Sequence, residues 1–123
     1  MSQENGNVVF LNKPKRFTLE EARSLLPQVR EITEEAVEGA AGVMHALERP
    51  DLTDGERQAY SEELKLMADA WASRIAKLGA LAKGLWLVDF DSGGGYYCWR
   101  YDEPELEFFH GYEDGFAGRT PIQ

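Results

Sequence analysis

The fold class is decided by residues 85–110, LWLVDFDSGGGYYCWRYDEPELEFFH. Aromatic and β-branched residues are concentrated here, and apolar residues recur with a period close to two, which is typical of β-strands. Two stretches of turn residues, Asp91–Gly95 and Asp102–Glu105, interrupt the pattern. Because short loops of this kind join antiparallel neighbours, we expect a three-stranded antiparallel sheet. Its strands would be Leu85–Phe90, Tyr96–Tyr101 and Leu106–His110.

Residues 17–84, upstream of this stretch, have the pattern of two long helices. Their apolar residues follow a three-four spacing, which places them on one face of a helix. The loop around Pro50 ends the first helix, and we expect the second to run to about Lys83, just before Gly84. Each helix starts with the residues of a capping box, Thr18 with Glu21 and Thr53 with Glu56. The segment therefore predicts a long antiparallel helical hairpin.

Residues 1–123 are expected to form a single α+β domain, in which the hairpin of 17–84 precedes the sheet of 85–110. Residues 1–16 are expected to be a tail, although the apolar run Val8–Leu11 can add an edge strand. Residues 111–123 are rich in glycine and predict an irregular C-terminal tail that is ordered only where it lies on another surface.

Charge and cysteine content narrow the classes of function. The formal net charge is −9, which repels phosphate backbones and acidic lipid headgroups, so we expect neither nucleic acid nor membrane as a partner. Cys98 is the only cysteine, which excludes an intrachain disulfide and fits a reducing compartment. The N-terminal residues are polar, and no stretch approaches the roughly 18 apolar residues of a membrane span. We expect a cytoplasmic protein.

The loop lengths also predict how the strands pair. With both turn stretches acting as complete loops, Phe90 pairs with Tyr96, and Tyr101 pairs with Leu106. This register places a row of three polar residues across one face of the sheet and puts Cys98 on the opposite face. A shift of one residue in either hairpin would remove the row. The row consists of Asp89, Tyr97 and His110.

This row has two functional interpretations and a structural one. A carboxylate that orients a histidine can support general-base catalysis. Asp89 and His110, with nearby Glu113, could instead bind a divalent metal ion, the one cofactor that these residues suggest. The structural alternative is that Asp89 begins the hairpin turn and His110 is a partly buried histidine bonded to backbone.

Two arginines and the cysteine complete the candidates. Arg100 either forms a cross-strand ion pair with Glu107 or receives a small anionic ligand. Arg119 follows a Gly-rich turn that either cradles a phosphate or carboxylate, or lays Phe116 on the sheet edge while Arg119 pairs with a carboxylate. Cys98 is expected to serve as a small hydrophobe. The candidate ligand-binding residues are Asp89, Tyr97, Arg100, His110 and Arg119.

Several motifs occur in the order seen in a known family. They are FTLEEARSLLP at Phe17–Pro27, GLWLVDF at Gly84–Phe90, CWR at Cys98–Arg100, EPE at Glu103–Glu105, His110, and GFAGRTP at Gly115–Pro121. In these motifs the chain resembles the bacterial domain-of-unknown-function family numbered 2203, from about residue 16 to the C-terminus. The resemblance implies that the C-terminal motifs belong together, and it brings no reaction, cofactor or catalytic residue.

Two functions of different classes follow from this reading. Helices of about 30 residues are roughly 45 Å long, whereas the sheet covers only roughly 20 by 15 Å, so part of the apolar stripe lacks a partner. We therefore expect a self-associating scaffold, a homodimer that buries the small-residue patch Gly39–Val43 in a four-helix bundle. The alternative is a small-molecule or metal-binding protein, and in one version an enzyme, with its site between the sheet and the C-terminal tail.

Overall fold

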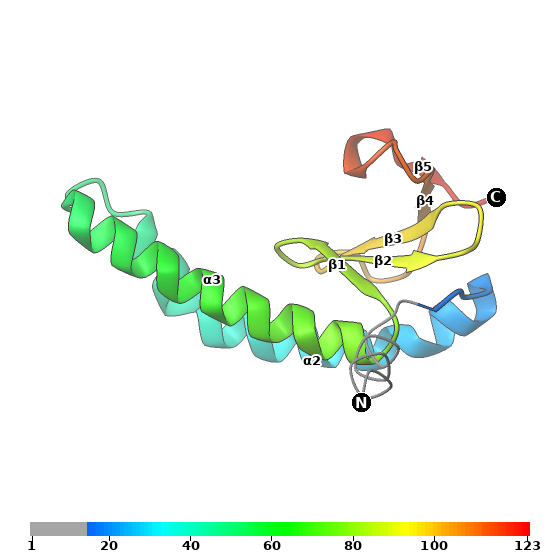
Figure 1. The fold of residues 1–123 in the computed structure, drawn as a ribbon, viewed down its shortest axis with the longest axis horizontal. Helices are drawn as coiled ribbons and strands as arrows, with labels where there is room; N and C mark the ends of the chain where they lie inside the picture. Colours follow the sequence, from blue (N-terminus) through cyan, green and yellow to red (C-terminus); the bar gives the residue numbers. More distant parts are fainter. Residues whose placement is uncertain (1–14) are drawn as a thin grey trace, which may run out of the picture.

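The structure, a computed structural model, describes residues 15–123 and has three layers (Figure 1). A helical hairpin forms the first layer and an antiparallel sheet the second. The C-terminal segment, residues 111–119, covers the face of the sheet that points away from the helices. The α+β class with a hairpin followed by a sheet is as predicted. The predicted edge strand Val8–Leu11 lies outside the described residues.

The hairpin consists of α2 (Leu19–Leu47) and α3 (Asp54–Lys77). Both predicted capping boxes are present. In the first, the Thr18 hydroxyl accepts the Glu21 backbone N–H at 3.1 Å, and the Thr18 N–H donates to the Glu21 carboxylate at 2.9 Å. The pair Thr53 and Glu56 repeats this arrangement at 3.0 and 2.9 Å. The helix starts are therefore set by local sequence.

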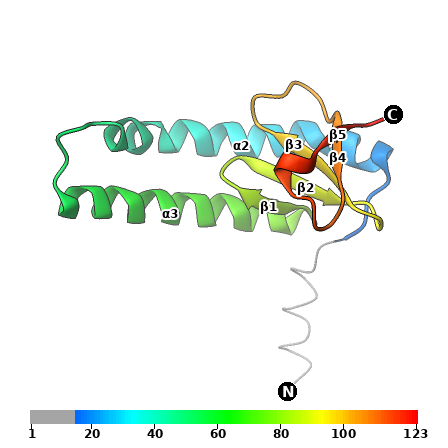
Figure 2. The same cartoon turned by 90° about the horizontal axis from the view of Figure 1, so that it is seen from above.

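The hairpin is longer than the sheet that it carries. The sheet lies over the open end, where α2 begins and α3 ends, and the loop end projects well beyond it (Figures 1 and 2). The two helices are joined near the sheet by the Trp71 indole N–H, which donates to the buried Thr33 hydroxyl at 2.9 Å. No helix within residues 15–123 is long and apolar enough to cross a membrane.

The second helix ends earlier than predicted, at Lys77 instead of about Lys83. Gly79 follows the C-cap with φ of 93°, a left-handed conformation that terminates a helix and favours glycine. The freed residues form β1 (Leu81–Gly84). Gly84 was an equally plausible end for the helix, because the apolar residues between Gly79 and Gly84 fit both the helical and the strand period.

The sheet has five antiparallel strands in sequential order, β1-β2-β3-β4-β5, where three were predicted. The two additional strands are the edges, β1 from the expected helix end and β5 from the expected irregular tail. The remaining strands are β2 (Leu87–Asp91), β3 (Tyr96–Arg100), β4 (Phe108–His110) and β5 (Thr120–Pro121), with the short 3-10 helix η1 (Phe116–Gly118) before β5.

Both predicted registers are wrong by one residue. Phe90 pairs with Tyr97, not Tyr96, because β2 continues through Asp91 and the loop is four residues long. The Ser92 N–H and hydroxyl both bond the Gly95 carbonyl oxygen, which closes this shorter loop. In the next hairpin, β3 ends at Arg100, whose N–H donates to the Glu103 side chain, and Tyr101 and Leu106 are not paired.

These shifts decide which residues share a face. Val88, Phe90 and Trp99 point toward the helices and are fully buried in the core with Val29 and Ile75. Paired residues of antiparallel strands lie on the same face. Asp89 pairs with Cys98, and His110 pairs with Tyr96 two positions along β3, so the opposite face carries three reactive side chains, Asp89, Cys98 and His110.

Candidate metal centre

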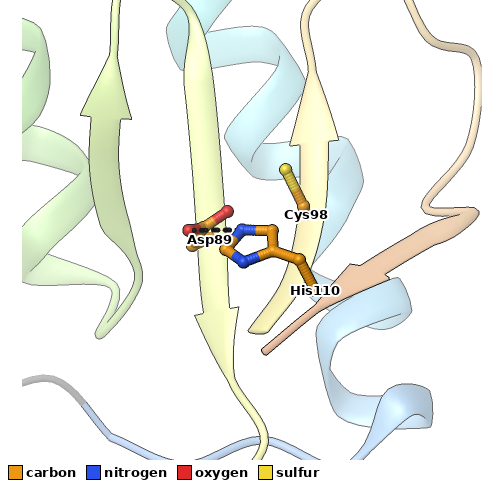
Figure 3. Close-up of side chains that lie close together, drawn as sticks. All are labelled: Asp89, Cys98 and His110. Atoms are coloured by element: carbon orange, nitrogen blue, oxygen red, sulfur yellow. Dashed lines mark hydrogen bonds and ion pairs between the residues drawn. The ribbon is translucent and has the colours of Figure 1, made fainter. Parts of the chain in front are cut away.

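Asp89, Cys98 and His110 meet on the outer face of the sheet, one from each of β2, β3 and β4 (Figure 3). One carboxylate oxygen, Sγ and one imidazole nitrogen all lie within 4.8 Å of one another. All three residues are buried, with exposed fractions of 5% or less. Carboxylate, thiolate and imidazole are the protein ligands of zinc and related transition metals.

His110 is held by both ring nitrogens. Nδ1 lies 2.8 Å from the Gly111 carbonyl oxygen, which can only accept, so Nδ1 carries a proton and donates it. Nε2 lies 3.1 Å from Asp89 Oδ2, with one proton between them. A histidine whose Nδ1–H is fixed by a backbone carbonyl presents Nε2 as a metal ligand in a set orientation.

Asp89 is unusual for a buried carboxylate. Its side chain is 3% exposed, and Oδ1 is the one buried side-chain nitrogen or oxygen within residues 15–123 that makes no hydrogen bond. Burial raises the pKa of the Asp89 carboxyl, and the Cys98 thiol, His110 and Lys83 offset only part of this shift. A buried oxygen without a donor is costly, and a cation would satisfy it.

Cys98 is not arranged as a nucleophile. Burial, together with the nearby Asp89 carboxylate, raises the pKa of the Cys98 thiol from 9.0 to about 12. Reactive cysteines have lowered pKa values and a base that takes the proton. Here both nitrogens of His110 are already engaged by Gly111 and Asp89. The trio therefore differs from a cysteine–histidine–aspartate catalytic triad although it contains the same residue types.

A cavity of about 200 Å³ adjoins the trio. The sheet forms its floor, and the C-terminal segment forms one wall. Tyr112 in that wall packs edge-on against Tyr96, with 5.0 Å between the ring centroids. Its hydroxyl donates to Asp91 Oδ1 at 2.7 Å. Besides the trio, the lining residues are Lys83, Leu87, Tyr96, Tyr112, Gly115 and Phe116.

The C-terminal segment is fastened to the sheet by a buried ion pair. Arg119 donates to both carboxylate oxygens of Glu103, at 2.7 and 3.0 Å, and both side chains are about one-tenth exposed. The guanidinium lies over two aromatic rings, 4.2 Å from the Phe108 centroid and 4.1 Å from the Phe116 centroid. The prediction that Arg119 pairs with a carboxylate is confirmed.

The structure separates the other predicted site residues from the trio. Tyr97 belongs to the opposite face, where it packs against the core, so the predicted row of Asp89, Tyr97 and His110 does not form. Glu113 is exposed and is absent from the cluster of potential ligands. Arg100 pairs with Asp102, two residues along, instead of Glu107. The Asp89–His110 contact survives because the two one-residue shifts add up to an offset of two residues, and side chains two positions apart on a strand lie on the same face.

Sequence reasoning placed Cys98 on the wrong face and missed Lys83, Tyr112 and Glu103. A signal for the correct register was present in Asp91 and Ser92. Aspartate and serine before glycines form side-chain turns, and here Asp91 Oδ1 accepts the Gly93 N–H at 2.8 Å. That signal favours a four-residue loop, which would have paired Asp89 with Cys98.

The fold and site together define a class: an α+β protein in which a helical hairpin supports a five-stranded antiparallel sheet with a potential metal-ligand cluster on its outer face. The family described as "Uncharacterized conserved protein (DUF2203)" matches residues 15–122, nearly the whole chain, and the chain belongs to this family. The resemblance seen in the sequence motifs is thereby confirmed. No curated protein and no solved structure matches the chain.

Proposed function

We propose that the protein binds a divalent transition-metal ion, of the type of zinc, through Asp89, Cys98 and His110. The observation that carries this proposal is the convergence of three buried ligand atoms of different chemistry within 4.8 Å. Nε2 and Oδ2, at 3.1 Å, already have the spacing of two ligands on one tetrahedral zinc, whose bonds are about 2.0–2.3 Å long. The Gly111 carbonyl supports the orientation of His110.

Charge favours a cation at this position. A divalent ion would displace two protons to solvent, the one held between His110 and Asp89 and the one on the Cys98 thiol, which becomes a thiolate. The two anionic ligands then balance the ion, which leaves a neutral buried cluster. Such a cluster also places a positive charge next to the Asp89 carboxylate, whose Oδ1 accepts no hydrogen bond in the metal-free arrangement.

Three protein ligands leave one tetrahedral position for an exchangeable ligand, as in catalytic zinc sites. The adjoining cavity, lined by the same three residues, supports this assignment. A metal ion with an open position polarises a bound ligand or lowers the pKa of a bound water. We therefore propose a metal centre that exchanges a ligand, and not a structural one.

Cobalt(II) binding tests this function. The metal-free protein should bind one equivalent of Co²⁺ with a thiolate-to-cobalt charge-transfer absorption, since Cys98 is the only thiol. Cys98→Ala should lose that absorption while melting close to the wild type, because the side chain is small. Asp89→Asn should weaken binding by more than the roughly 10–100-fold that loss of an outer-shell partner costs.

His45→Gln is the matched control, because His45 is an exposed histidine on α2 and should leave Co²⁺ binding unchanged. Absence of Co²⁺ binding, or a bound ion with no thiolate absorption, would refute the assignment. His110→Ala is less informative, since it leaves Asp89 buried without its partner and destabilises the fold for that reason.

A second function, self-association through the hairpin, is favoured by a separate observation. In α3 only Trp71 and Ile75 are buried, so the seventeen residues from Asp54 to Ala70 bury no side chain fully. Leu66 is 70% exposed. A groove of about 270 Å³ runs between the helices beside Ala36, Gly39 and Met67. We propose that a second copy of the chain covers this part of the hairpin in a four-helix bundle.

Matched glycine substitutions test self-association. A Cβ at Gly39 or at Gly55 would meet nothing within 4 Å, so the monomer tolerates a side chain at either position. Sedimentation equilibrium at tens of micromolar should show a dimer for the wild type and for Gly55→Glu, but a monomer for Gly39→Glu. A monomeric wild type, or equal dimerisation of both variants, would contradict the proposal.

A further inference from the structure

We propose that the cavity beside the metal centre binds a small organic monocarboxylate. This inference rests on the proposed function, because the carboxylate would occupy the open metal position. Its second anchor is the Lys83 ammonium group, and its apolar body lies against Tyr96 and Phe116. Volume, charge and wall composition each point to this class of ligand.

The volume sets the size of the ligand. A dry apolar cavity of about 150 Å³ holds a benzene molecule, and this cavity is about 200 Å³. It therefore admits a ring or a short branched chain together with a carboxylate. Drug-sized ligands use pockets of about 300–1,000 Å³, so a nucleotide or a peptide is too large.

The charge of the site sets the sign. With Asp89 and Cys98 neutralised by a divalent ion, Lys83 is the cationic side chain left in the lining. Lys83 makes no ion pair with any residue in 15–123, and its Nζ lies 4.6 Å from the centroid of the Tyr96 ring. Asp91, which is outside the lining, also feels the charge of Lys83, and its Oδ1 accepts the Tyr112 hydroxyl and the Gly93 N–H. With the metal ion bound, the lining itself therefore carries one net positive charge, which matches a monoanion.

The walls favour an organic anion over phosphate. Tyr96 and Phe116 present aromatic surface, and Leu87 adds aliphatic surface, so the cavity supplies little beyond Lys83 and the metal position for further anionic oxygens. Phosphate is recognised by several donors that converge on its oxygens, as in glycine-rich nests and arginine clusters. Arg119, which lies over the lining residue Phe116, is committed to Glu103 in a two-point pair.

The test uses the cobalt-loaded full chain with four probes. Benzoate should change the cobalt absorption and release heat in calorimetry, and it should bind more tightly than acetate, which lacks the ring. It should also bind more tightly than benzamide, which has the same shape without the charge. Inorganic phosphate should bind more weakly than benzoate.

Lys83→Gln should weaken benzoate binding by about tenfold, equivalent to about 1.4 kcal/mol, while the variant still binds one equivalent of Co²⁺ with the thiolate-to-cobalt absorption. Lys65→Gln, on the exposed side of α3, is the control and should change neither. If Co²⁺ binds but benzoate changes neither spectrum nor heat, or if benzamide or phosphate binds as well as benzoate, the carboxylate assignment fails alone. If no Co²⁺ binds, the proposed function fails and the inference fails with it.

Discussion

At the scale of single residues, Thr33 shows how one buried hydroxyl joins the two helices. It donates to the Val29 carbonyl oxygen at 2.8 Å within α2 and accepts the Trp71 indole N–H from α3 at 2.9 Å. The residue is fully buried. Both hydrogen-bonding functions of the hydroxyl are therefore used where water cannot replace them.

Thr33→Val tests this role, because valine has nearly the same shape and no hydroxyl. We expect a loss of about 1–3 kcal/mol in the free energy of unfolding, since the Trp71 N–H is left buried without an acceptor. Urea denaturation measures the change. Thr120→Val is the control, because the Thr120 hydroxyl is exposed and its bond to Phe109 O is 3.4 Å long. Equal losses in the two variants would contradict the assignment.

Cys98 provides a second test at this scale. Its thiol pKa is raised to about 12 in the folded, metal-free protein. A raised pKa means that the neutral thiol is favoured by folding, so the thiolate is suppressed between pH 9 and about 12. In EDTA, which keeps the protein metal-free, the difference in ultraviolet absorbance between the wild type and Cys98→Ser should show no thiolate up to about pH 10. In urea the same absorbance difference should titrate with a midpoint near pH 9. A midpoint near pH 9 in the folded protein would show that Cys98 is not buried as described.

At the scale of elements, the β2–β3 hairpin depends on close approach at one glycine. A Cβ on Gly95 would lie 2.4 Å from Phe109 Cζ and 2.7 Å from the His110 carbonyl oxygen. The second of these atoms is backbone, so it cannot move away without disturbing β4. The same loop contains Gly94, where a Cβ would meet nothing within 4 Å.

Gly95→Ala should therefore destabilise the protein by roughly 1–3 kcal/mol, the usual range for overpacking. Gly94→Ala should stay within about 0.5 kcal/mol of the wild type, as exposed substitutions do. Thermal melting of the two variants makes the comparison. A smaller drop for Gly95→Ala than for Gly94→Ala would show that the strands are not paired in this register.

At the scale of the whole molecule, the Arg119–Glu103 pair connects the end of the chain to the turn between β3 and β4. It holds the segment that forms one wall of the cavity, so it links overall stability to the shape of the site. Because the guanidinium lies over the Phe108 and Phe116 rings, its loss also removes packing.

Arg119→Ala should cost roughly 3–5 kcal/mol, because it leaves Glu103 buried without its partner. Arg119→Ala with Glu103→Gln should recover part of that loss, since the remaining amide carries no charge. Denaturant titration measures both. Arg74→Ala removes an ion pair with Glu35 that is about half exposed and should change the midpoint little. If Arg119→Ala behaves like Arg74→Ala, the pair does not hold the segment.

The local signals in the sequence were sufficient for the helix starts and the order of layers. The capping boxes at Thr18 and Thr53 need only residues three positions apart, and a change of hydrophobic period separates the hairpin from the sheet without tertiary information. The carboxylate partner of Arg119 was also expected, although its identity as Glu103 was not. These features depend on contacts that are close in sequence or on residue chemistry alone.

Tertiary structure alone decided the end of α3, the edge strands and the composition of the site. A Leu-Gly-Ala stretch fits either a helix or a strand until the left-handed Gly79 ends α3 and β2 offers β1 a partner. Register has a period of two, so a one-residue difference in loop length moved Cys98 to the face of Asp89 and His110 and removed Tyr97 from it. Local sequence determines where strands occur, whereas the pairing between them determines which side chains meet.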